Sequence, residues 1–85
     1  MNTCIRSTFK CTFDVFYSKV METEPEWSQF VDGYQIAKVD EHNSIMVMNV
    51  VDFEAMEAFM TTDDMKAWDA EYGCIDTVYT MDAAQ

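Results

Sequence analysis

Residues 33–51 hold the feature that most constrains the fold of this chain: two runs of strand-forming residues on either side of a short polar segment. The runs are residues 34–40 and 44–51, and the Glu-His-Asn sequence between them accepts turn geometry. We therefore predict a β-hairpin. Amphipathic helical patterns flank the hairpin, and each has a further strand-like run at its outer end. The predicted order is strand, helix, hairpin, helix, strand.

The segment before the hairpin predicts a strand followed by a helix. Residues 3–13 are rich in Thr, Phe and Ile and alternate loosely between apolar and polar positions, which is typical of a strand. Apolar residues then recur at helical spacing over residues 13–21, and Thr12 or Asp14 can cap that helix. We expect the apolar stripe of the helix to pack against a sheet.

Pro25 interrupts this helical pattern, but proline is tolerated in the first turn of a helix. Thr23 followed by Glu26 has the spacing of a capping box, in which the two side chains satisfy the first backbone N–H groups. We therefore predict that the helix restarts here. Asp32 and Gly33 mark its end before the hairpin.

The segment after the hairpin predicts a second interrupted helix and a last strand. Asp52 is a plausible cap for a helix that breaks and restarts over residues 61–64 and ends at Gly73. Residues 74–81 are β-branched and aromatic, which predicts a strand. Residues 82–85 are expected to form a short tail.

A tight turn centred on His42 and Asn43 sets the predicted register of the hairpin and divides its residues between two faces. One face is almost wholly apolar, and we assign it to the side of the helices. Its residues are Gln35, Ala37, Val39, Met46, Met48 and Val50. The other face is mixed, which suits a cleft or a contact with a second subunit. Its residues are Tyr34, Ile36, Lys38, Asp40, Ile45, Val47, Asn49 and Val51. A slip of one residue would exchange the faces.

These elements predict an α+β fold of the ferredoxin-like type, with βαββαβ order and one domain over residues 1–85. The four antiparallel strands are expected in the spatial order 4-1-3-2, with both helices on one face of the sheet. The other face is then uncovered. For a chain that is 49% hydrophobic, a second copy of the same sheet is the simplest cover.

The hairpin is followed by the sequence VDFEAMEAFMTTDDMKAWDAEYGCIDTVYTM, and the first strand is followed by TFDVFYSKV. Over residues 3–81 this pattern resembles small single-domain members of the dimeric α+β barrel superfamily, of the antibiotic-biosynthesis-monooxygenase type. The resemblance implies a homodimer that meets through its sheet faces. The superfamily includes cofactor-independent monooxygenases, haem-degrading enzymes and muconolactone isomerase-like enzymes. A shared fold does not transmit a reaction, so the resemblance predicts architecture rather than activity.

The net charge of −11 argues against binding to nucleic acid or to anionic lipid. No stretch approaches the length of a membrane span, and the amino terminus lacks the pattern of a signal peptide. Cys4, Cys11 and Cys74 form no Cys-x-x-Cys pair and have no neighbouring histidine, so we expect no metal site. We expect a reduced, cytoplasmic protein without a cofactor.

Basic residues are scarce in this chain, yet several of them share the predicted mixed face with polar residues. The candidate ligand-binding residues are Arg6, Thr8, Lys10, Tyr34, Lys38 and Asn49. One hypothesis is that the cations stabilise an anionic or enol-like ligand while the polar groups orient it. The alternative is that the cations pair with acidic residues, for example Lys10 with Asp76 on the adjacent strand.

Other candidate residues have structural interpretations beside the functional ones. His42 is the only histidine and would be the first choice for a general base, but a hairpin turn is normally solvent-exposed. Cys11 and Cys74 lack a charged activator nearby in sequence, which weakens a role as nucleophile. The aromatic residues that could line a pocket are equally compatible with a core. They are Trp27, Trp68, Tyr72 and Tyr79.

The sequence therefore leaves several functions open. The leading hypothesis is a homodimeric barrel protein that binds a small, anionic or aromatic ligand between the sheet and the helices. A non-catalytic dimerisation or regulatory module is the first alternative, and a cofactor-independent monooxygenase or isomerase is the second. No catalytic residue is assigned, because no obvious base lies in the predicted cleft.

Overall fold

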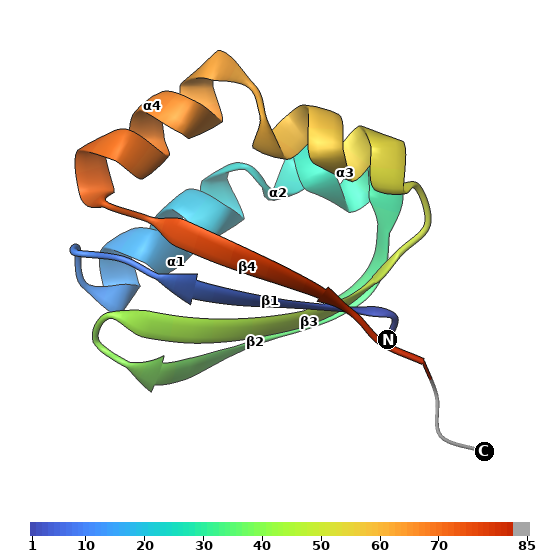
Figure 1. Ribbon diagram of the computed structural model, residues 1–85, viewed down its shortest axis with the longest axis horizontal. Helices are drawn as coiled ribbons and strands as arrows, with labels where there is room; N and C mark the ends of the chain where they lie inside the picture. The colour runs from blue at the N-terminus through green and yellow to red at the C-terminus, as the bar shows by residue number, and fades with distance from the viewer. Residues whose placement is uncertain (83–85) are drawn as a thin grey trace.

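A computed structural model describes residues 1–82 as a four-stranded antiparallel sheet with helices on one face (Figure 1). The strand order β2-β3-β1-β4 and the ferredoxin-like α+β architecture confirm the prediction. The elements, in chain order, are β1 (Thr3–Thr8), α1 (Phe13–Glu22), α2 (Glu24–Trp27), the 3-10 turn η1 (Ser28–Phe30), β2 (Val31–Asp40), β3 (Asn43–Val50), α3 (Phe53–Met60), α4 (Asp63–Tyr72) and β4 (Ile75–Thr80). The tail predicted at residues 82–85 lies almost entirely outside the described residues.

Polar side chains begin three of the helices, and two of these caps, Thr12 and Asp52, are among those that the sequence predicts. The hydroxyl groups of Thr12 and Thr62 accept hydrogen bonds from backbone N–H groups in the first turns of α1 and α4, and the Asp52 carboxylate does the same for α3. These contacts satisfy N–H groups that have no partner within the helix. Gly73 ends α4 in the left-handed conformation, with φ of 63°.

Two local predictions before the hairpin are wrong. The first strand ends at Thr8 rather than near residue 13, because the chain turns and buries Phe9 in a stack on Phe16, with ring centroids 4.3 Å apart. The capping box also fails. The Thr23 hydroxyl donates to the backbone oxygens of Lys19 and Val20 in the preceding turn, so it does not cap α2, although the helix does restart as predicted.

The β2–β3 hairpin has a different register from the predicted one. Asp40 pairs with Asn43, so the turn comprises Glu41 and His42, one residue earlier than expected. The register then shifts between Asp40 and Lys38, where Lys38 pairs with Ser44, and this irregularity is a β-bulge at Val39. A bulge adds one residue to one strand, so it reverses which β2 side chains share a face with those of β3.

The bulge turns Tyr34, Ile36 and Lys38 of β2 toward the helices. The Lys38 ammonium lies 5.8 Å from the centre of the Phe13 ring of α1, and the Tyr34 ring meets Trp27 edge to face at 4.8 Å between centroids. The predicted assignment of Tyr34 and Lys38 to the uncovered face is therefore wrong. For β3 the assignment is correct, since Met48 is buried on the helix side and Ile45 is exposed on the other.

A second shift of register falls between Val31 and Tyr34, where Gly33 has φ of 86°. The Asp32-Gly33 pair was expected to end the helix before the hairpin. Instead β2 already begins at Val31, and Gly33 occupies an irregular position within the strand. Positive φ costs glycine nothing, which is why this residue type suits the bend.

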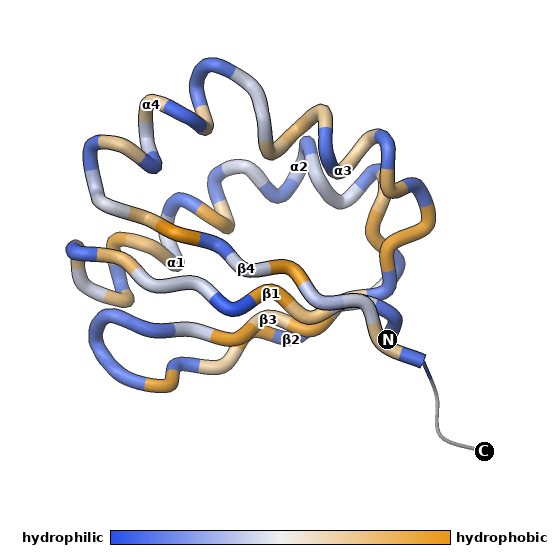
Figure 2. Tube along the Cα trace, in the orientation of Figure 1, coloured by the Kyte–Doolittle hydropathy of each residue, from blue (hydrophilic) through white to orange (hydrophobic). Residues whose placement is uncertain are grey.

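The buried core lies under α2, η1 and α3, near one end of the sheet. Its residues are Trp27, Phe30, Met48, Val50 and Met56. The packing is uneven, because no residue of α4 is fully buried. The hydropathy colours agree, since much of the α4 trace is blue whereas α3 carries more apolar positions (Figure 2).

Candidate ligand-binding site

A cavity of about 100 Å³ lies between the sheet and the helices. Its floor comes from residues of β1 and β3 that point toward the helices, and its walls come mainly from α1, α2, α3 and α4. Aromatic and methionine side chains make up most of this lining. They are Trp27, Phe30, Met46, Met48, Met56, Phe59, Met60, Met65 and Trp68. Such a surface suits an apolar or aromatic molecule.

Polar groups gather in one part of this lining, where β1 and β4 meet the end of α4. The Ser7 hydroxyl donates to the Asp76 carboxylate at 2.5 Å, and the Cys74 thiol donates to the same oxygen at 3.6 Å. Side-chain ligand atoms of Asp69, Cys74 and Asp76 all lie within 4.8 Å of one another. The result is an acidic patch, which we define as Ser7, Asp69, Cys74 and Asp76, on an otherwise apolar cavity.

Crowding shifts the protonation of two groups in the acidic patch. Burial is the larger cause that raises the pKa of Asp69, and repulsion from the Asp76 carboxylate adds to it, while a hydrogen bond with Cys74 opposes them. Burial and the two neighbouring carboxylates raise the pKa of the Cys74 thiol far above its ordinary value. Cys74 is therefore a protonated donor at neutral pH and an unreactive nucleophile.

The six candidate residues predicted from sequence do not come together. Arg6 and Thr8 of β1 lie on the uncovered face of the sheet, as does Asn49 of β3. Tyr34 and Lys38 lie on the helix side. None of the six lines the cavity, and a role for them in ligand binding stays a prediction.

Lys10 follows β1 in a loop, where its aliphatic chain lies close to Gly73 and its backbone N–H donates to the Tyr72 carbonyl at 2.8 Å. The suggested pair of Lys10 with Asp76 is not formed, since Asp76 accepts from Ser7 and Cys74 instead. The alternative of a surface ion pair holds for Lys38, whose ammonium pairs with Glu41.

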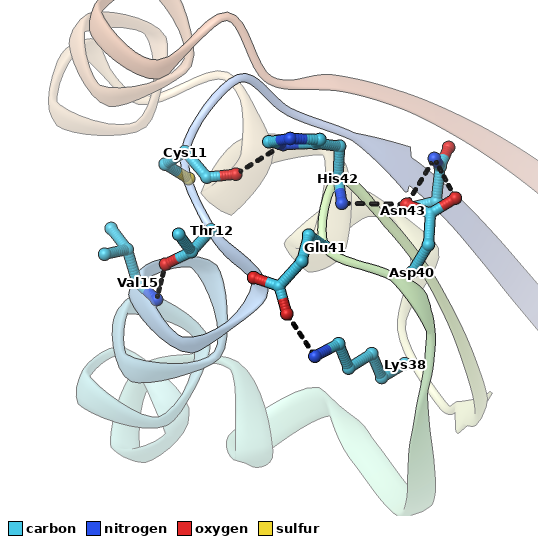
Figure 3. A network of polar contacts seen from close by, with 8 residues as sticks. All are labelled: Cys11, Thr12, Val15, Lys38, Asp40, Glu41, His42 and Asn43. Carbon is cyan, nitrogen blue, oxygen red and sulfur yellow. Dashed lines mark hydrogen bonds and ion pairs between the residues drawn. The ribbon is translucent and has the colours of Figure 1, made fainter.

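The tip of the β2–β3 hairpin satisfies its own polar groups (Figure 3). The Asp40 carboxylate accepts hydrogen bonds from the Asn43 amide and the His42 backbone N–H. These bonds, led by the one from Asn43, lower the pKa of Asp40. The His42 ring reaches the Cys11 carbonyl oxygen at 3.0 Å, and the ring is solvent-exposed as predicted. His42 therefore makes a structural contact and does not line the cavity.

The predicted aromatic candidates lie in different parts of the molecule. Trp27 and Trp68 line the cavity, whereas Tyr79 is half exposed on the uncovered sheet face. Tyr72 contacts Trp68, with 4.8 Å between ring centroids, and lies in a shallow groove between α1 and α4. The acidic patch was not found from sequence. Its available signal was a charged residue, Asp76, within a last strand that is otherwise β-branched and aromatic.

No helix within residues 1–82 combines the length and apolar character that crossing a membrane requires. A scan against models of known protein families found no match, and a search of curated proteins found none either.

Solved structures, by contrast, share this architecture. SnoaB, a cofactor-independent oxygenase from Streptomyces nogalater, superposes with a TM-score of 0.71 over 99% of this chain and 92% of its own, at 10% sequence identity. The chain has the fold of an antibiotic biosynthesis monooxygenase. A structure of that description gives a TM-score of 0.62 over 100% of both chains at 18% identity. A third, from Deinococcus radiodurans, gives 0.59 over 98% of this chain and 93% of its own at 7% identity.

These superpositions confirm the resemblance predicted from the sequence, at the level of the fold. Identities this low show architecture alone, so the activity of this chain has to be argued from its own cavity.

Proposed function

We propose that this protein binds a small, mainly apolar molecule in the cavity between its sheet and its helices. The cavity itself is the observation that carries this proposal. A packed interior has few voids larger than a water molecule, whereas this one has about 100 Å³ and opens beside a polar edge. An apolar pocket with a few polar groups at one end is the usual form of a small-molecule site.

The size of the cavity limits the ligand that enters without movement of the protein. Typical ligand pockets measure roughly 300–1,000 Å³. This cavity therefore holds a single ring or a short chain, and a larger ligand requires α4 to shift outward. The packing of α4 supports such a shift, because none of its residues is fully buried and its two large aromatic side chains, Trp68 and Tyr72, are partly exposed.

We also propose that two copies associate through the uncovered sheet face, in the cytoplasm. Several apolar residues are exposed on that face, among them Ile45 at 38%, Ile75 at 67% and Tyr79 at 50%. The three free cysteines are consistent with a reducing compartment. Ile45→Glu places a charge at the middle of the face and should convert the dimer to a monomer in sedimentation equilibrium. Val15→Glu, on the exposed side of α1, is the control that should stay dimeric, and a monomeric wild-type protein at micromolar concentration would overturn the proposal.

A cofactor-independent oxygenase or isomerase is a second candidate function. The Asp69–Asp76 pair favours it, because a carboxylate beside an apolar cavity is placed to accept a proton from an enol or phenol. The related oxygenase from Streptomyces nogalater supports the choice of reaction to assay. Oxygen uptake with a phenol as substrate, lost in Asp76→Asn, would establish it. A non-catalytic module is the remaining alternative, and it predicts neither uptake nor saturable binding.

Binding of a neutral probe tests the main proposal most directly. Titration of ¹⁵N-labelled protein with 2-phenylethanol should give saturable shifts at cavity residues such as Met56, Phe59 and Trp68. Met60→Trp, which fills the cavity from α3, should abolish them. Met21→Trp is the matched control, because Met21 packs beside the core without lining the cavity. Shifts that do not saturate, or equal binding by both variants, would overturn the proposal.

A further inference from the structure

The acidic patch gives the cavity a charge that its own residues do not balance. Asp69 and Asp76 line the cavity, and within residues 1–82 neither carboxylate forms a salt bridge. The hydrogen bonds they accept within the patch are few. Asp76 accepts from Ser7 and Cys74, and Asp69 has a hydrogen bond with Cys74 and is repelled by Asp76. Carboxylates accept up to about four hydrogen bonds each, so acceptor capacity is left over.

A compensating charge could come from the cavity wall itself. Within residues 1–82, Lys19 of α1 is the one basic residue that lines the cavity, and it is partly exposed. The described part of the chain shows no ion pair between Lys19 and either carboxylate. Two negative charges therefore line the cavity against one positive charge that is not paired with them. An anionic ligand would add a third negative charge next to the patch, which is unfavourable in a poorly solvated site.

The remaining walls favour a positive charge as well. Trp27, Phe30, Phe59 and Trp68 line the same cavity. The faces of aromatic rings attract cations, with Trp the strongest, and several rings around one site are the usual means of binding an organic ammonium group. Aromatic walls and unpaired carboxylates thus point to the same chemistry, while each alone would fit several kinds of ligand.

We propose that the ligand of this cavity is an organic cation, namely a protonated amine on a small apolar or aromatic group, whose ammonium contacts Asp69 and Asp76. The proposal rests on the proposed ligand-binding function and narrows it. It also reverses the sign of the charge that the sequence suggested. The apolar part of the ligand occupies the methionine and aromatic walls, and the ammonium supplies the donors that the two carboxylates lack.

Three probes of matched shape and different charge test this proposal. They are 2-phenylethylamine, 2-phenylethanol and phenylacetate, which at pH 7 are a cation, a neutral molecule and an anion. Isothermal titration of the protein should show the amine binding about tenfold tighter than the alcohol, which corresponds to about 1.4 kcal/mol, because both donate hydrogen bonds to the carboxylates but only the ammonium adds an opposite charge. Phenylacetate should bind more weakly than the alcohol.

Two variants then locate the preference. Asp69→Asn and Asp76→Asn should each bring the ratio of amine to alcohol affinity close to one, because each removes a negative charge that the ammonium contacts. Glu71→Gln is the matched control, because it removes the same charge from an exposed position on the same helix as Asp69. The Asp76→Asn variant could unfold because its hydrogen bond with Ser7 is weakened. In that case the Asp69→Asn variant still tests whether the carboxylates cause the preference for the amine.

The outcomes distinguish the proposal of a cationic ligand from the more general proposal that the cavity binds a small molecule. Equal affinities for amine and alcohol, tighter binding of phenylacetate, or a preference that survives Asp69→Asn would overturn the cationic ligand while leaving the binding function intact. A preference lost equally in Glu71→Gln would show that the whole acidic surface, and not the patch, attracts the amine, and this too would overturn it. Absence of binding by all three probes would overturn both proposals.

Discussion

The helical layer of this protein has two unlike halves. Under α2, η1 and α3 the side chains are well packed, with Trp27, Phe30 and Met48 all less than 10% exposed. In α4 no residue is fully buried. In the following strand, β4, Asp76 is partly buried and the other residues are exposed. The cavity spans both halves, because core residues such as Trp27, Phe30 and Met48 line it together with Met65 and Trp68 of α4, and the acidic patch lies at the α4 end.

The two halves differ in packing rather than in which of them lines the cavity, since the well-packed core residues form one part of the cavity wall and the loosely packed α4 forms another. Apolar burial near η1 and α3 holds the fold, because buried area removed from water is the dominant favourable term. The α4 half leaves apolar surface and two carboxylates incompletely covered, which costs stability but leaves room for a ligand. Local unfolding is expected to begin in this half, since it has few buried contacts.

Truncation of one methionine in each half gives the largest expected effect. Met48→Ala removes a side chain that is 4% exposed at the centre of the core, and it should lower the free energy of unfolding by about 2–5 kcal/mol. Met65→Ala on the partly exposed face of α4 should cost less than about 1.5 kcal/mol. Urea denaturation measures both values. Equal losses would show that the two halves are packed alike.

Gly73→Ala should have the next largest effect, because it strains the junction of α4 and β4. The backbone there has φ of 63°, and an added β-carbon would approach the Lys10 chain to 2.8 Å. We expect a loss of about 1–2 kcal/mol. Gly33→Ala is the control, since φ is 86° but the nearest atom, Met1 Cε, would be an ordinary contact at 3.7 Å. A smaller loss at Gly73 than at Gly33 would mean that Lys10 moves aside freely.

Asp69→Asn should increase the stability of the protein at pH 7, whereas the preceding substitutions decrease it. A carboxyl group whose folded pKa is raised binds more protons in the folded state, so the wild-type protein loses stability as pH rises from 3.8 through the folded pKa. At pH 7 the substitution removes this cost and should raise the free energy of unfolding by less than about 1 kcal/mol, because the group is partly solvated. Thermal unfolding at pH 4 and pH 7 measures the difference. Destabilisation at pH 7 would show that Asp69 contributes to the fold.

The smallest effect on stability is expected at the hairpin tip, where the pKa of Asp40 is lowered whereas that of Asp69 is raised. Its hydrogen bonds from Asn43 and His42 lower its pKa, so the stability that it contributes is present above pH 3.8 and is lost as pH falls through the folded pKa. An NMR titration of the side-chain carboxyl carbons should place Asp40 below 3.8 and Asp69 above it. The reverse order would contradict the contrast between a satisfied tip and an unsatisfied cavity edge.

Much of the architecture was predictable from local signals. Thr12, Asp52 and Gly73 mark helix boundaries by short-range chemistry that depends on neighbours in sequence, and the structure confirms all three. The strand order also follows from the succession of elements, since few topologies satisfy short connections and right-handed crossovers. The resemblance to the antibiotic biosynthesis monooxygenases rested on these same patterns.

The candidate site was much less predictable, and the bulge at Val39 explains part of the reason. Nothing in the residues around Val39 marks an irregular position, yet one extra residue moves Tyr34 and Lys38 from the uncovered face to the helix side. The basic residues predicted to share the mixed face therefore lie on opposite sides of the sheet, with Arg6 on the uncovered face and Lys38 on the helix side. A prediction that depends on strand register fails when a single unrecognised residue changes the alternation.

The sequence by itself determined the order of the elements, the layer architecture and the helix caps, because these follow from periodicity and from contacts within a few residues. Only the tertiary structure decided which side chains share the cavity. Ser7 and Asp76 are 69 positions apart in the chain and meet only because β1 pairs with β4. That pairing, which no local pattern encodes, brings the Asp76 carboxylate beside the residues of β1 that form the floor of the cavity.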